Sequence, residues 1–218
     1  MIIKSKPLKP FFFKLAAGIL NLFIKARFNK TVINNMDIKP GHSYILMCNH
    51  FSFADGFFAF FLCNKVFWGK NKMQRLYIMS LKKQMQKNKW LQYVGSFSID
   101  PRKRSIRESM EYAAEVLSTP GNLLLFFPQG NLESHHITHI HFEDGLKEIV
   151  PLIKGPCQLI WCSTIIEFFE STKPSIHYNM LDCGTNQTFD FDALKTKVNT
   201  YHLNTLNSYV RFTDQPIS

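Results

Sequence analysis

The amino-acid sequence predicts one α/β domain with a mixed, mostly parallel sheet that is flanked by helices. Continuous apolar runs at 43–47 and 122–127 indicate strands that are buried on both faces, as parallel strands are. Helix-like segments alternate with the expected strands, and polar loops follow them, which is the chain order of α/β proteins. The 218 residues are enough for one such domain with a large core.

The expected elements follow from the apolar patterns and from the turn residues between them. Strands are expected at 43–47, 75–80, 122–127, 157–169 and 174–183, and a further short strand is expected ahead of the cationic turn in the segment 95–104. Helices are expected at 57–62, 82–90, 105–117, 142–153 and 191–209. Pro151 bends or ends the helix that begins at Phe142, because proline lacks the amide hydrogen that a helix interior requires.

Residues 1–40 form a basic and apolar segment ahead of the α/β domain that we expect at 41–218. Lys14 and Asn21 interrupt the apolar run 11–24, which falls short of the roughly 20 apolar residues that cross a bilayer. No clear small-residue cleavage site marks a signal peptide. We therefore expect an amphipathic, membrane-facing helix whose lysines meet lipid head groups. A helix that docks on the core of the domain is compatible with this.

A polar pair, His50 and Asp55, lies between the apolar strand at 43–47 and the apolar helix at 57–62. Polar side chains in such surroundings need partners. With His50 in the loop and Asp55 in the first helical turn, the two side chains can meet. Asp55 would then fix the imidazole tautomer and leave the other ring nitrogen free as a base.

The same residues also fit a purely structural role. Ser52 and Asp55 have the spacing of a capping box, with Ser52 as N-cap and Asp55 near the positive end of the helix. His50 is equally consistent with a hydrogen-bonded histidine at the edge of a core. On this segment alone, both interpretations stay open.

The charge of the chain is concentrated in its N-terminal half. Residues 1–104 carry 19 Lys and Arg against three Asp, although the net charge of the whole chain is only +10. Such a surface favours polyanionic partners, namely nucleic acid, anionic lipid or a phosphorylated cofactor. Arg102, Lys103 and Arg104 precede the expected helix at 105–117, where helix amides add to a phosphate cradle. A solvated charge run is the alternative.

Three polar positions follow expected strands and form the physical argument for a site. His50, Arg102 and Gln129 each come after such a strand. Open α/β sheets bind ligands at the carboxyl ends of their strands. We therefore expect these residues to converge on one edge of the sheet.

The cysteines and histidines do not predict a disulfide framework or a metal site. The five cysteines form no Cys-x-x-Cys pair and lie mostly in apolar runs, which indicates reduced thiols in a cytosolic environment. The histidines at 135, 136, 139 and 141 match no common zinc spacing. We expect a surface loop or a ligand-facing lip there, and no metal.

Three motifs in this order resemble the glycerolipid acyltransferase family, which acylates lysophosphatidate, glycerol phosphate and other lysolipids. They are Asn49-His50-x4-Asp55, Gly95-Ser96-Phe97-Ser98-Ile99-Asp100 and Phe127-Pro128-Gln129-Gly130, and the resemblance covers roughly residues 43–170. It implies the α/β fold of 1-acylglycerol-3-phosphate acyltransferases. It also implies that His50 is the general base for the acceptor hydroxyl and that Asp55 orients it.

The third block departs from the pattern of the family. The typical run is Phe-Pro-Glu-Gly-Thr-Arg-Ser, but Gln129 stands at the glutamate and Leu132 at the arginine. Pro101 stands where the second block usually has arginine, and the proline of the fourth block has no clear counterpart. Leucine cannot replace arginine at a bidentate phosphate site. The resemblance therefore implies the reaction class more securely than the acceptor.

The resemblance also implies substrate contacts and a location. The donor would be acyl-CoA or acyl carrier protein, with no cofactor, and the enzyme would act peripherally on the cytoplasmic face of a membrane. The expected substrate-binding residues are Arg102, Lys103, Arg104, Gln129, Gly130 and Asn131. Acyl chains or bilayer would contact Phe57, Phe58, Phe60 and Phe61. The alternatives are acylation of a non-phosphate or amine acceptor, or a non-enzymatic basic module that binds membrane or nucleic acid.

Overall fold

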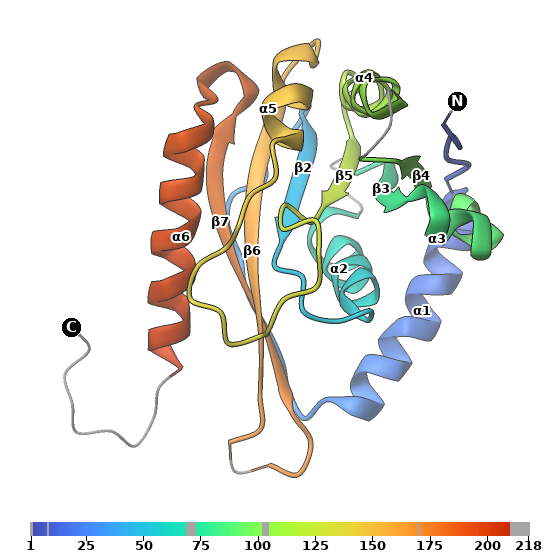
Figure 1. Ribbon diagram of the computed structural model, residues 1–218. Coiled ribbons are helices and arrows are strands. Elements are labelled where there is room, and N and C mark those ends of the chain that lie inside the picture. Colours follow the sequence, from blue (N-terminus) through green and yellow to red (C-terminus); the bar gives the residue numbers. More distant parts are fainter. Residues whose placement is uncertain (1, 8, 69–72, 102–104, 170, 210–218) are drawn as a thin grey trace.

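A seven-stranded sheet with the strand order β1-β7-β6-β2-β5-β3-β4 organises the described part of the chain (Figure 1). The computed structural model describes residues 2–7, 9–68, 73–101, 105–169 and 171–209. Strands β2 to β6 run parallel to one another, whereas β7 pairs antiparallel with β6 and β1 pairs parallel with β7. The predicted mixed, mostly parallel sheet is thus confirmed. The strands are β1 (Thr31–Asn34), β2 (Ser43–Cys48), β3 (Arg75–Leu81), β4 (Ser96–Ile99), β5 (Asn122–Phe126), β6 (Cys157–Glu167) and β7 (Ser175–Thr185).

Helices cover both faces of this sheet. Figure 1 places α6 beside β7 on one side of the molecule and α1 beside α2 on the other. Short π or 3₁₀ turns follow several elements, at Cys63–Phe67, Lys89–Val94, Val150–Leu152 and Asn186–Thr188. The α-helices are α1 (Pro10–Arg27), α2 (Asp55–Leu62), α3 (Lys82–Lys87), α4 (Ser105–Leu117), α5 (Gly145–Ile149) and α6 (Phe191–Ser208).

Strand β2 is central, and the alternation of its side chains explains why its sequence is apolar throughout. Tyr44 and Leu46 pack in the core under α1 and α2, whereas Ile45 and Met47 pack in the core under α4, α5 and α6. All four side chains are fully buried. A strand with helices on both faces has no solvent side and therefore carries no polar alternation.

The structure differs from the expected elements in three places. Strand β1 was not expected, and it extends the sheet by pairing with β7. The expected helix at 82–90 ends at Lys87, because Asn88 leaves helical geometry with φ −121° and ψ 77°. The expected helix at 142–153 is reduced to α5 and one 3₁₀ turn that contains Pro151, in line with the helix-ending effect of proline.

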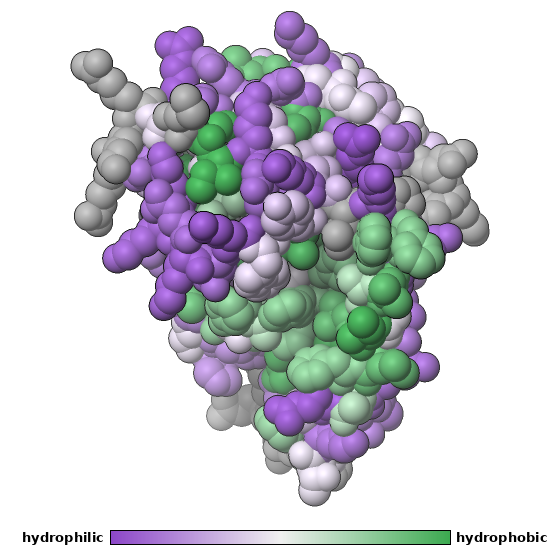
Figure 2. Space-filling model, turned by 90° about the vertical axis from the view of Figure 1, so that its right-hand side faces the viewer, coloured by the Kyte–Doolittle hydropathy of each residue, from purple (hydrophilic) through white to green (hydrophobic). Residues whose placement is uncertain are grey.

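Helix α1 is apolar on two opposite sides. Phe13 packs inward with its ring stacked 4.2 Å from that of Trp68, and Ala17 and Ile24 are also buried. The outward side carries large exposed apolar residues, and Figure 2 shows a continuous apolar area, bordered by hydrophilic residues, on the face of the molecule that carries α1. None of the described helices combines the length and the apolar character that crossing a bilayer demands. The exposed residues are Phe11, Phe12, Leu15, Ile19, Leu22 and Phe23.

The cysteines are free thiols in the structure, and four of the five are buried. Burial raises the pKa of the Cys157 thiol to about 12, because the thiolate loses its hydration there. Such thiols stay protonated and pack as small apolar side chains.

Gly95 occupies a tight corner between the 3₁₀ turn Lys89–Val94 and β4. Its φ is +97°, and a Cβ atom there would lie 2.2 Å from the carbonyl oxygen of Leu76. We expect Gly95→Ala to lower the free energy of unfolding by at least about 2 kcal/mol, since both the backbone angle and the contact are unfavourable. Denaturant unfolding measures this. Gly18→Ala in α1, where nothing lies within 4 Å, is the control and should not destabilise the protein.

A buried chain of hydrogen bonds connects α6 to β6 and to the loop after β5. The indole Nε1–H of Trp161 donates to Ser163 Oγ at 2.8 Å, and Ser163 Oγ lies 2.9 Å from His202 Nδ1. His202 Nε2 lies 3.1 Å from the carbonyl oxygen of Ile137, which can only accept. His202 is therefore the neutral tautomer with its proton on Nε2, and the serine hydroxyl donates to Nδ1.

This network makes stability depend on pH. Burial lowers the pKa of His202 in the folded state, so the unfolded chain, with a pKa near 6.5, binds the proton more readily. Stability should therefore fall as pH drops below about 6.5, by up to about 1.4 kcal/mol per pH unit until the folded pKa is reached. Denaturant unfolding at pH 7.5 and 5.5 measures the loss. His202→Gln, which can keep both hydrogen bonds without titrating, should show a smaller loss; an equal loss would contradict this assignment.

Candidate active site

His50 and Asp55 meet at the carboxyl end of β2. His50 lies in the loop that follows the strand, and Asp55 is the first residue of α2. The imidazole Nδ1 is 2.9 Å from the carboxylate Oδ2 of Asp55. The carboxylate is 4% exposed and the imidazole 24% exposed. The pair thus consists of a buried acid and a histidine that substrate can reach.

The loop backbone holds the Asp55 carboxylate in place. The amides of Phe51 and Ser52 donate to the same Oδ2 atom, at 2.7 and 2.8 Å. Ser52 is not the N-cap of α2 as the capping-box interpretation expected, because Ala54 occupies that position and Ser52 Oγ accepts from the amide of Ala54 and not from that of Asp55. One carboxylate oxygen of Asp55 therefore binds both backbone amides and the histidine, which fixes the position of the carboxylate.

The orientation of His50 follows from this carboxylate and from one aromatic ring. Because the carboxylate accepts, Nδ1 carries the proton and the lone pair of Nε2 is available for a proton from elsewhere. The ring of Phe127 stacks on the imidazole, with centroids 4.3 Å apart and planes inclined by 24°. An imidazole fixed in this way can serve as a general base.

A second loop, after β5, closes around the backbone of His50. The His50 amide donates to Gln129 Oε1 at 2.6 Å, and Gln129 Nε2 donates to the carboxylate of Glu133. The Glu133 amide in turn donates to the carbonyl oxygen of His50 at 2.9 Å. Gln129 is only 2% exposed. These contacts form a closed ring that joins the two loops.

Asn49 joins the same loop to the neighbouring strand β6. Its side-chain amide donates to the carbonyl oxygen of Thr164 at 3.0 Å, and its oxygen accepts from the Thr164 amide at 2.8 Å. The side chain is buried. It therefore continues the backbone pairing of β2 with β6 by one residue and fixes the start of the loop that carries His50.

The sequence model of the family described as Acyltransferase matches residues 29–163, which include both loops of the site. The chain belongs to the acyltransferase family. A search of curated protein sequences gave no match.

Among solved structures, the acyltransferase resembles PlsC, the 1-acyl-sn-glycerophosphate (LPA) acyltransferase of Thermotoga maritima. The TM-score is 0.59 at 14% sequence identity, and the match covers 94% of this chain and 82% of PlsC. This likeness establishes the shared fold. Membership of the family favours an enzyme over the non-enzymatic module that the basic N-terminal half allowed.

The other residues that were expected to bind substrate occupy different surroundings. Gly130 and Asn131 are exposed in the turn after Pro128. Gly130 has φ +70°, and its amide donates to the carbonyl oxygen of Phe127 at 3.3 Å. This amide is therefore engaged inside the turn. Arg102, Lys103 and Arg104 lie outside the described residues; the strand before them, β4, is the last strand on its side of the sheet.

The four phenylalanines of α2 point in different directions. Phe58 and Phe61 are buried in the core, with their rings near those of Phe28 and Tyr178. Phe60 is half-buried and packs against Phe13 of α1, with ring centroids 4.6 Å apart. Phe57 is exposed, two residues after Asp55. Of this group, Phe57 is therefore the side chain best placed for contact with substrate or lipid.

His135, from the histidine-rich segment, also lies beside the site. Its Nε2 accepts from the amide of Ile166 at 3.2 Å, and its ring meets that of Phe51 edge-on at 4.5 Å. Burial lowers its pKa, which favours the neutral form that these contacts require. Within the described ranges, no group of three or more His, Cys, Asp or Glu residues could hold a metal ion. His135 therefore supports the loop of Phe51.

Sequence reasoning did not identify several residues that shape the site. Glu133 and Phe127 contact Gln129 and His50, but a glutamate in a polar loop and an aromatic at a strand end have many ordinary roles. Thr164 contacts Asn49 across the sheet, 115 positions away in sequence. The one signal available was the position of Phe127 and Gln129 at the end of a strand, where sites of α/β proteins gather.

Proposed function

We propose that this acyltransferase moves a fatty acyl group from a thioester donor to a hydroxyl group of a lysolipid or a related lipid acceptor. The donor is acyl-CoA or acyl carrier protein. The observation that carries the proposal is the 2.9 Å contact between His50 Nδ1 and a buried, backbone-bound Asp55 carboxylate. The pair is placed at the carboxyl end of a central strand, where α/β proteins hold their substrates.

His50 acts as the general base in this reaction. Its Nε2 takes the proton of the acceptor hydroxyl while the acceptor oxygen attacks the thioester carbonyl carbon. Asp55 stabilises the imidazolium that forms, because its buried carboxylate lies against Nδ1. The carbon–sulfur bond then breaks, and the leaving thiolate takes the proton from His50. The products are an ester and a free thiol.

The described residues at the acceptor end of the site are compatible with more than one chemical class of acceptor. Leu132 is exposed, and Glu133 beside it places a carboxylate next to Gln129. These described residues offer no cation to a phosphate, so a non-phosphate acceptor, including an amine, belongs among the candidates. Phosphate contacts of the donor or the acceptor are assigned to the cationic segment 102–104. Gly130 and Asn131 border the site on its exposed side.

We further propose that the enzyme works on the cytoplasmic face of a membrane, where its thioester donors are dissolved. The exposed apolar side of α1 supports this, because a contiguous apolar surface of this kind is costly in water and suits a lipid interface. Residues 1–40 serve as the interfacial segment and 41–218 as the catalytic domain. Phe57 contacts the acyl chain near the reacting groups.

A lipid-product profile tests the proposed function. The full chain is incubated with acyl-CoA or acyl carrier protein and with a panel of phosphorylated, neutral and amine-bearing lysolipids on vesicles, and new acylated lipids are identified by mass spectrometry. We expect one acceptor class to gain an acyl chain, and that product to be missing with His50→Ala. Hydrolysis of the donor without any acylated product would overturn the proposal.

A further inference from the structure

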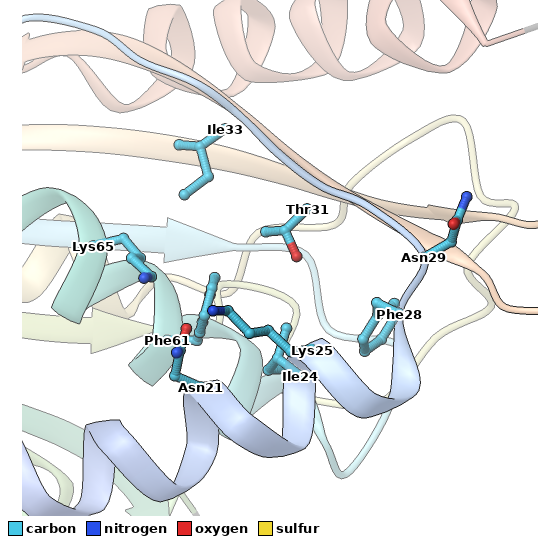
Figure 3. A pocket seen from close by; sticks show the side chains of 9 residues that line it. All are labelled: Asn21, Ile24, Lys25, Phe28, Asn29, Thr31, Ile33, Phe61 and Lys65. Carbon is cyan, nitrogen blue, oxygen red and sulfur yellow. The ribbon is translucent and has the colours of Figure 1, made fainter.

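A surface pocket lies between α1, β1 and the turn that follows α2 (Figure 3). Its volume is about 360 Å³. It lies toward the opposite end of α2 from the catalytic pair, since Asp55 begins this helix whereas Phe61 is its second-last residue and Lys65 follows it. The lining residues are Asn21, Ile24, Lys25, Phe28, Asn29, Thr31, Ile33, Phe61 and Lys65.

Two lysines, Lys25 and Lys65, line this pocket, and the Nζ of Lys65 lies 5.4 Å from the centroid of the Phe61 ring. Figure 3 shows the side chains of Lys25 and Lys65 extending toward the same space, together with the amide of Asn21. No acidic side chain is among the lining residues, and neither lysine forms an ion pair with a carboxylate in the part of the chain that the structure describes. Two like charges that face one space repel each other, and an anion between them removes that repulsion.

The rest of the pocket is mostly apolar, with Asn29 and Thr31 as the polar exceptions, and it borders the exposed apolar side of α1. Ile24, Phe28 and Phe61 are buried and form part of its wall. Leu22, which is exposed, lies three positions before Lys25 and thus on the adjacent stripe of the helix. A ligand in the pocket therefore meets cations and an apolar wall, and it lies next to the surface that we assign to the membrane.

We propose that this pocket binds the phosphate group of an anionic phospholipid when α1 lies on the membrane. Lys25 and Lys65 hold the phosphate, and the amide of Asn21 donates a hydrogen bond to it. The lipid tails follow the exposed apolar side of α1 into the bilayer. This inference rests on the proposed membrane attachment, but it does not depend on the acyl-transfer chemistry. It gives the enzyme a preference for anionic membranes.

Vesicle binding tests the proposal with charge-changing and charge-preserving variants. The full chain is mixed with phosphatidylcholine vesicles that contain or lack phosphatidylglycerol, and binding is measured by sedimentation. Lys25→Gln with Lys65→Gln should lose roughly 25-fold in affinity for the anionic vesicles, about fivefold for each lysine. Thr31→Tyr fills the pocket without changing the charge and should weaken the anionic preference as well. Lys9→Gln with Lys14→Gln removes the same charge outside the pocket, at the N-cap and near the start of α1, and should lose clearly less.

The outcomes distinguish binding in the pocket from general attraction to a basic surface. If the two lysine double variants lost equal affinity for anionic vesicles and Thr31→Tyr had no effect, binding in the pocket would be refuted. General attraction to a basic surface would then explain the result. Failure of the unaltered chain to bind any vesicle would overturn both the pocket and the membrane attachment. A soluble source of phosphate is tested with inorganic phosphate at constant ionic strength. If the protein left the anionic vesicles when phosphate was added, but stayed bound without phosphate at the same ionic strength, the occupant of the pocket would be reassigned from a lipid to a free anion.

Discussion

Replacing His50 with alanine is expected to slow acyl transfer by about 10²–10⁴-fold, the range that general bases contribute. The substitution removes the nitrogen that takes the acceptor proton but leaves the Asp55 carboxylate bound to the amides of Phe51 and Ser52. The loss should therefore appear in kcat at saturating acceptor and donor. Steady-state rates with the acceptor found by the product profile measure it.

The matched control is His139→Ala, which makes the same change at an exposed histidine of the loop after β5. It should leave the rate within about twofold of the unaltered enzyme, since exposed substitutions of this kind have small effects. Denaturant unfolding of both variants shows whether the fold is intact. A folded His50→Ala enzyme that retained its rate would remove the proposed base and, with it, the proposed mechanism.

The sheet could be predicted from sequence because burial on both faces leaves a simple pattern. Ile45 and Leu46 point to opposite cores, so β2 needs apolar residues at every position. Strand β1 has no such pattern, since Thr31 and Asn34 are exposed and its place depends on pairing with β7. A four-residue edge strand is defined by its partner, and the partner is about 145 positions away.

The pairing of His50 with Asp55 could be predicted because both residues lie within one short loop. The surroundings of the phenylalanines of α2 could not, because this helix is apolar all round and its sequence does not say which side α1 covers. Phe60 is half-buried because Phe13 of α1 packs on it, whereas Phe57 is exposed. The exposure of each phenylalanine therefore depends on contacts with elements that are distant in sequence.

The contacts of Gln129, a residue of the site itself, could not be predicted from the sequence either. The family resemblance implied a substrate-binding position, but both ends of the side chain bind protein groups, the His50 amide and the Glu133 carboxylate. An amide can accept from the first and donate to the second, whereas a carboxylate can only accept. Glutamine at 129 therefore suits glutamate at 133. We infer that Gln129 is a positioning residue for His50.

Gln129→Glu is accordingly expected to be harmful, although glutamate is typical of the family at this position. It would place two carboxylates against each other at a buried site, which costs about 1–3 kcal/mol or more in lost hydrogen bonding. Glu133 would have to move, and its amide would release the carbonyl oxygen of His50. We expect kcat to fall by about tenfold or more through misplacement of the base, with a smaller change in KM for the acceptor.

Adding Glu133→Gln to this variant should restore much of the lost rate. In the double variant, the carboxylate introduced at position 129 accepts both from the His50 amide and from the new side-chain amide at position 133, so the ring of hydrogen bonds closes again and only the bond between positions 129 and 133 is reversed. Rescue of kcat distinguishes positioning from substrate binding, because a direct contact between Gln129 and substrate would not be repaired by a change at position 133. A double variant no faster than Gln129→Glu alone would contradict the positioning role and return Gln129 to the substrate-binding residues.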